Sequence, residues 1–303
     1  MPPAKVSIAI FAYNEEATIS AALDAVGACA KEAALTAHVL INGCSDGTER
    51  IVRAYRPAGF ALCPVVIKRG DKANAWNHYT HEIAPSDATI HVFTDGDMTM
   101  LSGSITGFLE QLAAEPRANG CAGLPATGRS HAAFRDKLVR SHEMAGNLYA
   151  VRGACLMEFR RRGIKLPFGM FGEDGLVTTL IKYDLDPSGP LNEDRIAASL
   201  KGGFAYPSLS PWRPGDWRIY RNRRMRYAVR RQQAEMLYPL LIEHGIDAMP
   251  AHVVELYRAR QDVLAWHWNG LGTYFDWVAC RRIRRDITAH GDVTAEERAH
   301  LYS

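Results

Sequence analysis

The feature that most limits the possible folds is a regular alternation of short apolar runs with helical segments over the first two hundred residues. The runs 6–11, 38–41, 64–67 and 89–94 are typical of buried strands, and the segments 15–30, 48–55 and 72–83 are typical of helices. Strands that alternate with helices in this way predict βαβ units and a mainly parallel sheet. We therefore expect an α/β fold.

The pattern changes after residue 212. Before it, we expect a helix over 101–115, a segment at 121–124, a basic helical stretch over 135–149, a short strand at 154–157 and a helix from Glu173 to Tyr183. After it, only helices are indicated, over 217–244, 251–266 and 271–285. Pro211, Pro214 and Gly215 mark the change. The sequence thus predicts an α/β domain over 1–212 and a C-terminal helical extension over 213–303.

Two carboxylates end one of the predicted strands. Asp95 and Asp97 flank Gly96 after the run 89–94, and ligands of open α/β sheets bind at the carboxyl edge of the strands. Hard oxygen ligands without thiolates suit Mg²⁺ or Mn²⁺. A second pair, Asp184 and Asp186, lies in a predicted loop, so position rather than spacing carries the signal. We expect polar turns at 13–15, 43–48 and 95–97 to meet in one crevice.

Composition indicates a folded protein of the cytoplasm. The chain of 303 residues is 47% hydrophobic and 23% charged, which is ordinary for a globular protein. Its six cysteines show neither C-x-x-C pairs nor metal-ligand spacing, which favours reduced thiols. The chain has no apolar leader and no run long enough to span a bilayer. We expect a cytoplasmic protein, with a peripheral position on the inner membrane face as an alternative.

The motifs taken in order resemble the family 2 glycosyltransferases of the GT-A fold. The matching segments are Ala12-Tyr13-Asn14-Glu15, Asn42-Gly43-Cys44-Ser45-Asp46-Gly47-Thr48, Lys72 to Asn77, Asp95 with Asp97, Gly153 to Arg161, Glu173-Asp174 and Arg223 to Tyr227. The resemblance covers residues 5 to about 230. It implies a Rossmann-like, mainly parallel sheet and an inverting transfer of a sugar from a nucleotide diphosphate to a hydroxyl group.

The resemblance also implies roles for individual residues. Asp97 would hold Mn²⁺ or Mg²⁺ on the diphosphate, with Asp95 on the ribose or the metal's water shell, and Asp174 would be the general base. Gly153 and Glu173 would belong to the acceptor site. The nucleotide-sugar-binding residues would be Ala12, Tyr13, Glu15, Asn42, Asp46, Lys72, Asp95, Gly96, Arg223 and Arg226. The acceptor is a hydroxyl of a sugar, a polysaccharide or a lipid-linked molecule.

One departure from the family pattern concerns the nucleotide base. Asn42 stands where the family usually has an Asp that recognises uracil, and Cys44 replaces a Ser. An Asn side chain accepts a hydrogen bond from a base N–H through its oxygen, but its amide also donates. A UDP-sugar is therefore the leading prediction, with GDP-sugars and others open.

Several of these residues also have a purely structural interpretation. Tyr13 is an ordinary aromatic for a strand end, and Lys72 suits a solvated first helical turn. Asn42 and Asp46 are common in turns, and Asp46 suits a helix cap. Glu173 and Asp174 are favoured at a helix N-terminus by the helix dipole.

The C-terminal part combines arginines with aromatic residues. Between Arg213 and Arg231 there are eight arginines and one acid, Asp216, and Arg223, Arg226 and Arg230 share one helix face. This face is solvated, closes over the donor diphosphate, or attracts anionic lipid heads or a lipid-phosphate acceptor. The aromatic segment 266–277 suits packing on the catalytic domain, contact with a membrane interface, or stacking on an acceptor sugar. Nucleic acid is not expected, because aromatic and basic residues do not interleave on one face.

Two other classes of function remain. Asp95-Gly-Asp-Met-Thr99 fits the Asp-x-Asp-x-Thr motif of haloacid-dehalogenase-like phosphatases, in which Asp95 would be the nucleophile. That motif normally ends the first strand of its domain, and here three strand–helix units precede it. The third class is a GT-A module that binds without turnover, and the set Asp95, Asp97 and Asp174 argues against it.

Overall fold

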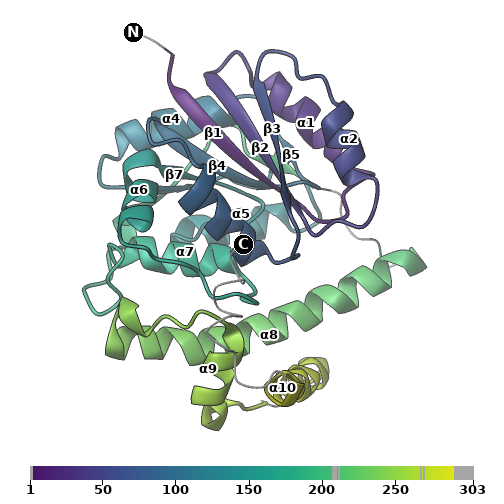
Figure 1. Cartoon of the computed structure of the whole chain (residues 1–303), viewed down its shortest axis with the longest axis vertical. Helices are drawn as coiled ribbons and strands as arrows, with labels where there is room; N and C mark the ends of the chain where they lie inside the picture. Colours follow the sequence, from purple (N-terminus) through teal and green to yellow (C-terminus); the bar gives the residue numbers. More distant parts are fainter. Residues whose placement is uncertain (1–2, 207–209, 211, 267, 269, 290–303) are drawn as a thin grey trace.

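The computed structural model describes residues 3–206, 210, 212–266, 268 and 270–289. Its centre is a seven-stranded sheet in the order β3-β2-β1-β4-β7-β6-β8 (Figure 1). The strands are β1 (Lys5–Ala12), β2 (Ala34–Asn42), β3 (Ala61–Ile67), β4 (Ile90–Asp95), β6 (Gly120–Ala122), β7 (Leu148–Arg152) and β8 (Ile196–Ala198). Only β7 runs antiparallel to its neighbours. The predicted mainly parallel sheet is confirmed.

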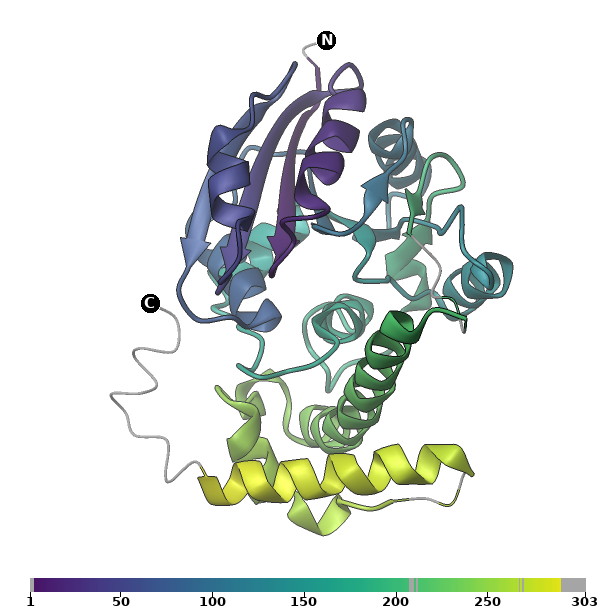
Figure 2. The same cartoon turned by 90° about the vertical axis from the view of Figure 1, so that its right-hand side faces the viewer.

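Helices cover both faces of this sheet (Figures 1 and 2). One face buries α1 (Ile19–Ala28), α2 (Thr48–Ala54) and α4 (Ser104–Ala114), through side chains such as Leu23, Val52 and Phe108. The other face buries α3 (Lys72–His78), its π-helical continuation Tyr79–Ile83, α6 (Gly153–Arg161) and α7 (Glu173–Lys182). Alternate strand residues point to opposite faces, so each strand feeds both cores. This two-sided burial explains why the strands read as continuous apolar runs.

Smaller elements complete the catalytic part. A two-stranded antiparallel sheet joins β5 (Thr99–Met100) to β9 (Phe204–Ala205). Helix α5 (His131–Ser141) packs through Leu138 against Leu124 and Ala145.

Three helices follow, α8 (Pro214–His244), α9 (Val253–Ala259) and α10 (Leu271–Ala289). The second half of α8 buries Met236, Leu237 and Leu241 in the core that also contains α7. Its first half extends along the lower side of the body in Figure 1 and is largely exposed. The predicted C-terminal helices are present, whereas the division into 1–212 and 213–303 stays a prediction. Residues 290–303 and parts of the aromatic segment 266–277 lie outside the described residues.

Two expectations for the middle of the chain are wrong. The predicted strand at 154–157 is part of α6, because Cys155, Leu156 and Phe159 are buried at helical spacing. The predicted helix over 135–149 ends at Ser141, and its last two residues, Leu148 and Tyr149, begin β7. The central segment is therefore helix–strand–helix rather than helix–strand.

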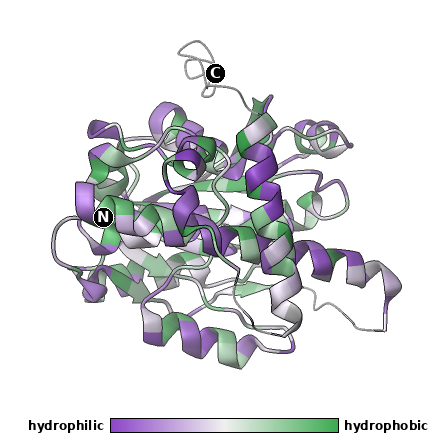
Figure 3. Cartoon of the chain, turned by 90° about the horizontal axis from the view of Figure 1, so that it is seen from below, coloured by the Kyte–Doolittle hydropathy of each residue, from purple (hydrophilic) through white to green (hydrophobic). Residues whose placement is uncertain are grey.

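The helices carry hydrophilic and hydrophobic residues in alternation along their length (Figure 3). Among the helices that the structure describes, none joins sufficient length to sufficient apolar character for crossing a bilayer.

Candidate active site

The ends of three neighbouring strands form one edge of the sheet. Asp95, the last residue of β4, is in register with Phe11 of β1, and Ala12 is in register with Ile41 of β2. The turns that follow these strands therefore lie side by side. Gly96 donates its N–H to the Phe11 carbonyl, 2.8 Å away, and a Cβ at Gly96 would come within 3.1 Å of that oxygen. The register therefore brings the polar turns after β1, β2 and β4 to one edge of the sheet.

The first two turns are tied to each other. Asn14 has a positive φ of 56° and accepts a hydrogen bond from the Ser45 N–H at 2.8 Å. Cys44 donates its thiol to the Ala12 carbonyl at 3.3 Å and accepts from the Asn14 N–H at 3.3 Å. The turns after β1 and β2 thus form one hydrogen-bonded unit. The sequence does not reveal this use of Asn14 and Cys44.

Asp46 and Asn42 have structural partners in this edge. Asp46 accepts from the N–H and hydroxyl of Thr48 at 3.0 and 2.6 Å, and from the Glu16 N–H at 3.1 Å. Burial opposes ionisation, but these hydrogen bonds outweigh it and lower the pKa of Asp46. The buried Asn42 accepts from the Asp71 N–H at 3.0 Å. The turn-forming interpretation of both residues accounts for their contacts with the protein.

Tyr13 presents an open aromatic face beside this unit. Its ring is 59% exposed, and a Cβ at Gly70 would come within 3.3 Å of it. Gly43, with a φ of +67°, could not carry a side chain either, because its Cβ would meet the Gly70 backbone at 2.6 Å. The two glycines therefore let the loop before α3 approach the Tyr13 ring.

Lys72 begins α3 and reaches across the crevice to two carboxylates. Its Nζ lies 2.5 Å from Asp95 Oδ1 and 2.8 Å from Glu173 Oε1, and 5.1 Å from the centre of the Phe11 ring. Burial disfavours the ammonium, but the two carboxylates outweigh it and hold the pKa of Lys72 well above its usual range. The solvated interpretation of Lys72 is therefore wrong. This lysine joins the end of β4 to the start of α7.

Asp174 faces the same crevice from the first turn of α7. Its Oδ2 accepts the Gly146 N–H at 2.9 Å. A Cβ at Gly146 would lie 3.2 Å from Lys72 Nζ, 3.3 Å from Glu173 Oε1 and 3.5 Å from Asp174 Cβ. The backbone of Gly146 thus lies between the Lys72–Glu173 ion pair and the side chain of Asp174. Nothing in the sequence marks Gly146 for this place.

Arg230 of α8 reaches Asp174 from the other side. Its Nη1 lies 3.1 Å from Asp174 Oδ1. A Cβ at Gly172 would come within 2.2 Å of the guanidinium Nε, and one at Gly175 within 2.6 Å of Nη2. The two glycines that flank Glu173-Asp174 therefore make room for the arginine. The sequence places Arg230 on the face of Arg223 and Arg226 but does not reveal its partner.

The carboxylates at this edge raise one another's pKa values. Burial raises the pKa of Glu15 to about 7, and the charges of Asp97 and Asp95 add to the rise. Within the described ranges, no three His, Cys, Asp or Glu side chains gather closely enough to hold a metal by themselves. A divalent ion fits here if one or two carboxylates and the phosphate oxygens of a ligand share it, which is the usual binding of Mg²⁺ beside phosphates.

Arg223 and Arg226 lie within electrostatic reach of this cluster. Desolvation raises the pKa of Asp97, and the charges of Lys72, Arg223 and Arg226 act against that rise. The first half of α8 therefore brings positive charge to the open side of the crevice, where Asp97 is exposed.

One predicted position, Gly153, and the second acidic pair lie elsewhere. Gly153 donates its N–H to the Thr89 carbonyl at 2.9 Å, at the amino end of β4. Because β7 is antiparallel to β4, the chain leaves β7 at the edge opposite Asp95, and the structure does not bring Gly153 to the crevice. The second acidic pair is structural, since Asp184 binds Arg195 at 2.7 Å and Asp186 accepts from the Ser188 hydroxyl at 2.6 Å.

The mainly parallel sheet with carboxylates after β4 and C-terminal helices is the GT-A arrangement of enzymes that use nucleotide sugars. A family model described as glycosyl transferase family 2 matches residues 7–170, more than half of the chain. The chain therefore belongs to this family and is a glycosyltransferase. The phosphatase and binding-module alternatives are set aside.

Solved structures show the same fold. The mannosyltransferase PcManGT from Pyrobaculum calidifontis, in complex with GDP-Man and Mn²⁺, is 18% identical with a TM-score of 0.55, over 99% of this chain and 79% of that one. Residues 1–349 of TarS from S. aureus, in complex with UDP-GlcNAc, are 12% identical with a TM-score of 0.50, over 96% and 95% of the chains. A comparison with curated protein sequences finds no match.

Proposed function

We propose that the protein transfers a sugar from a nucleotide-diphosphate sugar to a hydroxyl acceptor with inversion, using Asp174 as general base. The observation that carries this proposal is the position of Asp174. Its carboxylate accepts the Gly146 N–H, and Gly146 also lies against Lys72 and Glu173. Because Lys72 binds Asp95, Asp174 lies near the edge that ends in Asp95 and Asp97.

In this proposal, Tyr13 offers its exposed ring to the nucleotide base, and Arg223 and Arg226 bind the diphosphate from the side of α8. Asp97, with Asp95 nearby, would hold Mn²⁺ or Mg²⁺, which supplies positive charge to the departing diphosphate. The positive charge of Lys72 pairs with Asp95 and Glu173 and so reduces the electrostatic repulsion between the two carboxylates.

The reaction needs one base. Asp174 takes the proton of the acceptor hydroxyl as its oxygen bonds to the anomeric carbon, and the bond from that carbon to the diphosphate oxygen breaks with its electron pair on the diphosphate. A single displacement inverts the anomeric configuration, so no covalent enzyme intermediate is required. Arg230 and the Gly146 N–H orient the carboxylate for this task.

A UDP-sugar is the favoured donor, because the Asn42 oxygen can accept a hydrogen bond from a base N–H as the usual Asp does. A GDP-sugar is the alternative, and the two similar structures contain GDP-Man and UDP-GlcNAc. A cytoplasmic location and contact of the C-terminal helices with a membrane surface stay predictions.

A thermal-shift screen of UDP, GDP, ADP and CDP, each with and without Mn²⁺, tests the donor site. We expect one of them to raise the melting temperature only when the metal is present. Absence of metal-dependent stabilisation by all four would overturn the donor-site assignment. The anomeric configuration of a transferred sugar, read by proton NMR, then tests inversion.

A further inference from the structure

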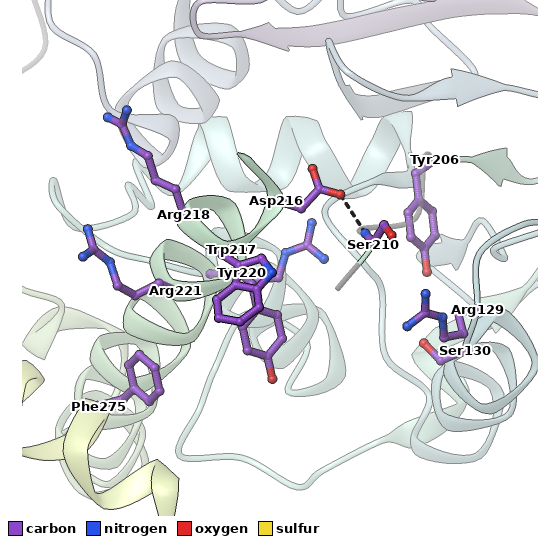
Figure 4. A pocket seen from close by; sticks show the side chains of 11 residues that line it. Arg129, Ser130, Tyr206, Ser210, Asp216, Trp217, Arg218, Tyr220, Arg221 and Phe275 are labelled. Carbon is purple, nitrogen blue, oxygen red and sulfur yellow. Dashed lines mark hydrogen bonds between the residues drawn. The ribbon is translucent and has the colours of Figure 1, made fainter. Parts of the chain in front are cut away.

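A pocket of about 900 Å³ lies between α5, α8 and α10 (Figure 4). Arg129 and Ser130 line it just before α5, Tyr206 lines it after β9, and Phe275 lines it from α10. The first turns of α8 form its remaining wall. Of the residues that line it, only Arg223 has a role in the function proposed above, and the volume is large enough for a molecule of sugar-phosphate size or more.

Aromatic rings form the middle of the pocket. Trp217 and Tyr220 lie next to each other on α8, and Figure 4 shows them between Phe275 on one side and Tyr206 on the other. Both are solvent-exposed, at 67% and 56%. Exposed rings of this size suit the apolar body of a ligand or the flat face of a sugar.

The charge of the pocket is positive. Arg218 and Arg221 line it on one side of the Trp217–Tyr220 pair and Arg129 on the other. In the described part of the chain, Arg218 and Arg221 have no ion-pair partner. The acid that lines the pocket, Asp216, accepts a hydrogen bond from the Ser210 N–H at 2.7 Å. Guanidinium groups bind phosphate and carboxylate strongly, so the pocket selects an anion.

Arg223 connects the pocket to the candidate active site. It lines the pocket, and its charge acts on the carboxylate of Asp97. A ligand held in the pocket therefore shares Arg223 with the proposed binding of the donor diphosphate.

We propose that this pocket binds the acceptor, and that the acceptor carries a phosphate group next to an apolar or ring-shaped body. The phosphate contacts the arginines, and the body rests on Trp217 and Tyr220. This inference rests on the proposed function, because it places the acceptor beside the donor. A phosphorylated lipid and a phosphorylated sugar share this chemistry.

Isothermal titration calorimetry of the whole protein distinguishes these sources. The probes are octyl phosphate below its micelle concentration, glucose 6-phosphate, inorganic phosphate and neutral octyl glucoside. We expect octyl phosphate or glucose 6-phosphate to bind at least about tenfold more tightly than inorganic phosphate and octyl glucoside. A preference for octyl phosphate assigns the lipid source, and a preference for glucose 6-phosphate assigns the free sugar.

Two pairs of variants locate the binding. Trp217→Ala and Arg221→Gln should each weaken binding about tenfold. Trp212→Ala and Arg213→Gln, exposed neighbours that do not line the pocket, should not change it. Equal binding of inorganic phosphate and the larger probes, or unchanged binding in Trp217→Ala and Arg221→Gln, would overturn the inference.

A parallel titration of UDP and GDP with Mn²⁺ distinguishes failure of the acceptor pocket from failure of the donor site. Nucleotide binding without binding of either organic phosphate refutes the acceptor pocket and leaves the proposed function standing. Failure to bind UDP and GDP, together with no metal-dependent stabilisation by any of the four nucleotides in the thermal-shift screen, refutes the proposed function itself.

Discussion

Arg230 lies 3.1 Å from Asp174 and is the contact through which α8 reaches the proposed general base. The contact depends on two glycines, Gly172 and Gly175, whose missing side chains leave the space that the guanidinium fills. The proposed catalytic group is therefore held by a helix that begins 40 residues after it in the sequence.

Replacement of Arg230 by Gln should lower kcat by about tenfold to a hundredfold, because the carboxylate loses a charged orienting contact. The KM for the donor should change little, since Arg230 does not touch the proposed donor site. Steady-state kinetics measure both constants, and Arg230→Lys should restore part of kcat. Arg224→Gln, on the same helix with its guanidinium 5.5 Å from the Phe275 ring, is the matched control. An equal effect on KM and kcat would contradict a positioning role.

Asp174→Asn should retain nucleotide binding and lose transfer by about a hundredfold to ten-thousandfold, the usual contribution of a general base. The amide keeps the shape and still accepts a hydrogen bond from Gly146, so folding should be preserved. Product formation by chromatography and nucleotide binding by calorimetry give the two readings. Full activity in this variant would remove Asp174 as the base.

Asp97→Asn should abolish the part of nucleotide stabilisation that depends on Mn²⁺, because one anionic oxygen ligand is lost. The chain offers its own control in Asp186→Asn, from the second acidic pair, where the carboxylate only caps a turn. Melting temperatures with UDP or GDP, with and without Mn²⁺, compare the two variants. Retained metal dependence in Asp97→Asn would exclude Asp97 as a ligand.

Lys72→Met should lower the free energy of unfolding by about 3 kcal/mol at neutral pH, because Asp95 and Glu173 remain inside without their cation. Urea unfolding at equilibrium measures the change. Lys201→Met removes an exposed ion pair with Glu110 and should cost less than about 1 kcal/mol. Equal losses in the two variants would show that Lys72 is not holding a buried cluster together.

The contribution of His91 to stability should fall as pH decreases from about 6.5 towards 4. Burial lowers the pKa of His91 to about 4, and the charge of Arg160 adds to the effect. Because the unfolded chain binds the proton near pH 6.5 and the folded chain does not, stability from this residue is complete above 6.5. It is lost by up to about 3 kcal/mol as pH falls through the folded value.

Unfolding by urea between pH 7 and 4 tests this slope. His91→Gln should flatten it, whereas His131→Gln, an exposed residue at the start of α5, should leave it unchanged. A slope that stays the same in His91→Gln would assign the effect to other groups.

The sequence predicts the edge of the sheet well, because hydrophobic periodicity and turn residues are local signals. The positions of Asp95, Asp97 and the turn at Tyr13 follow from where the strands end. Gly153 shows where this fails, since one antiparallel strand, β7, sends the chain to the opposite edge. Strand direction depends on pairing between distant segments, which a single sequence does not display.

The contacts that complete the site are also invisible to local patterns. Gly146 is identified only by what a Cβ would meet there, namely Lys72 and Glu173. Arg230 gave a partial signal, because it shares a helix face with Arg223 and Arg226 at spacings of three and four residues. That spacing indicates a common direction but not the carboxylate at its end.

The hydrogen bonds that join Asn14 to Ser45 and Cys44 to Ala12 have a consequence for how such enzymes diversify. Each of these hydrogen bonds joins a side chain of one turn to the backbone of the other, so a substitution at Asn14 or Cys44 should disturb both turns. On the opposite side, α8 reaches the proposed general base through the side chain of Arg230. Because Arg223 of this helix lines the pocket and is also proposed to bind the donor diphosphate, a change in α8 that admits a new acceptor should alter donor binding as well.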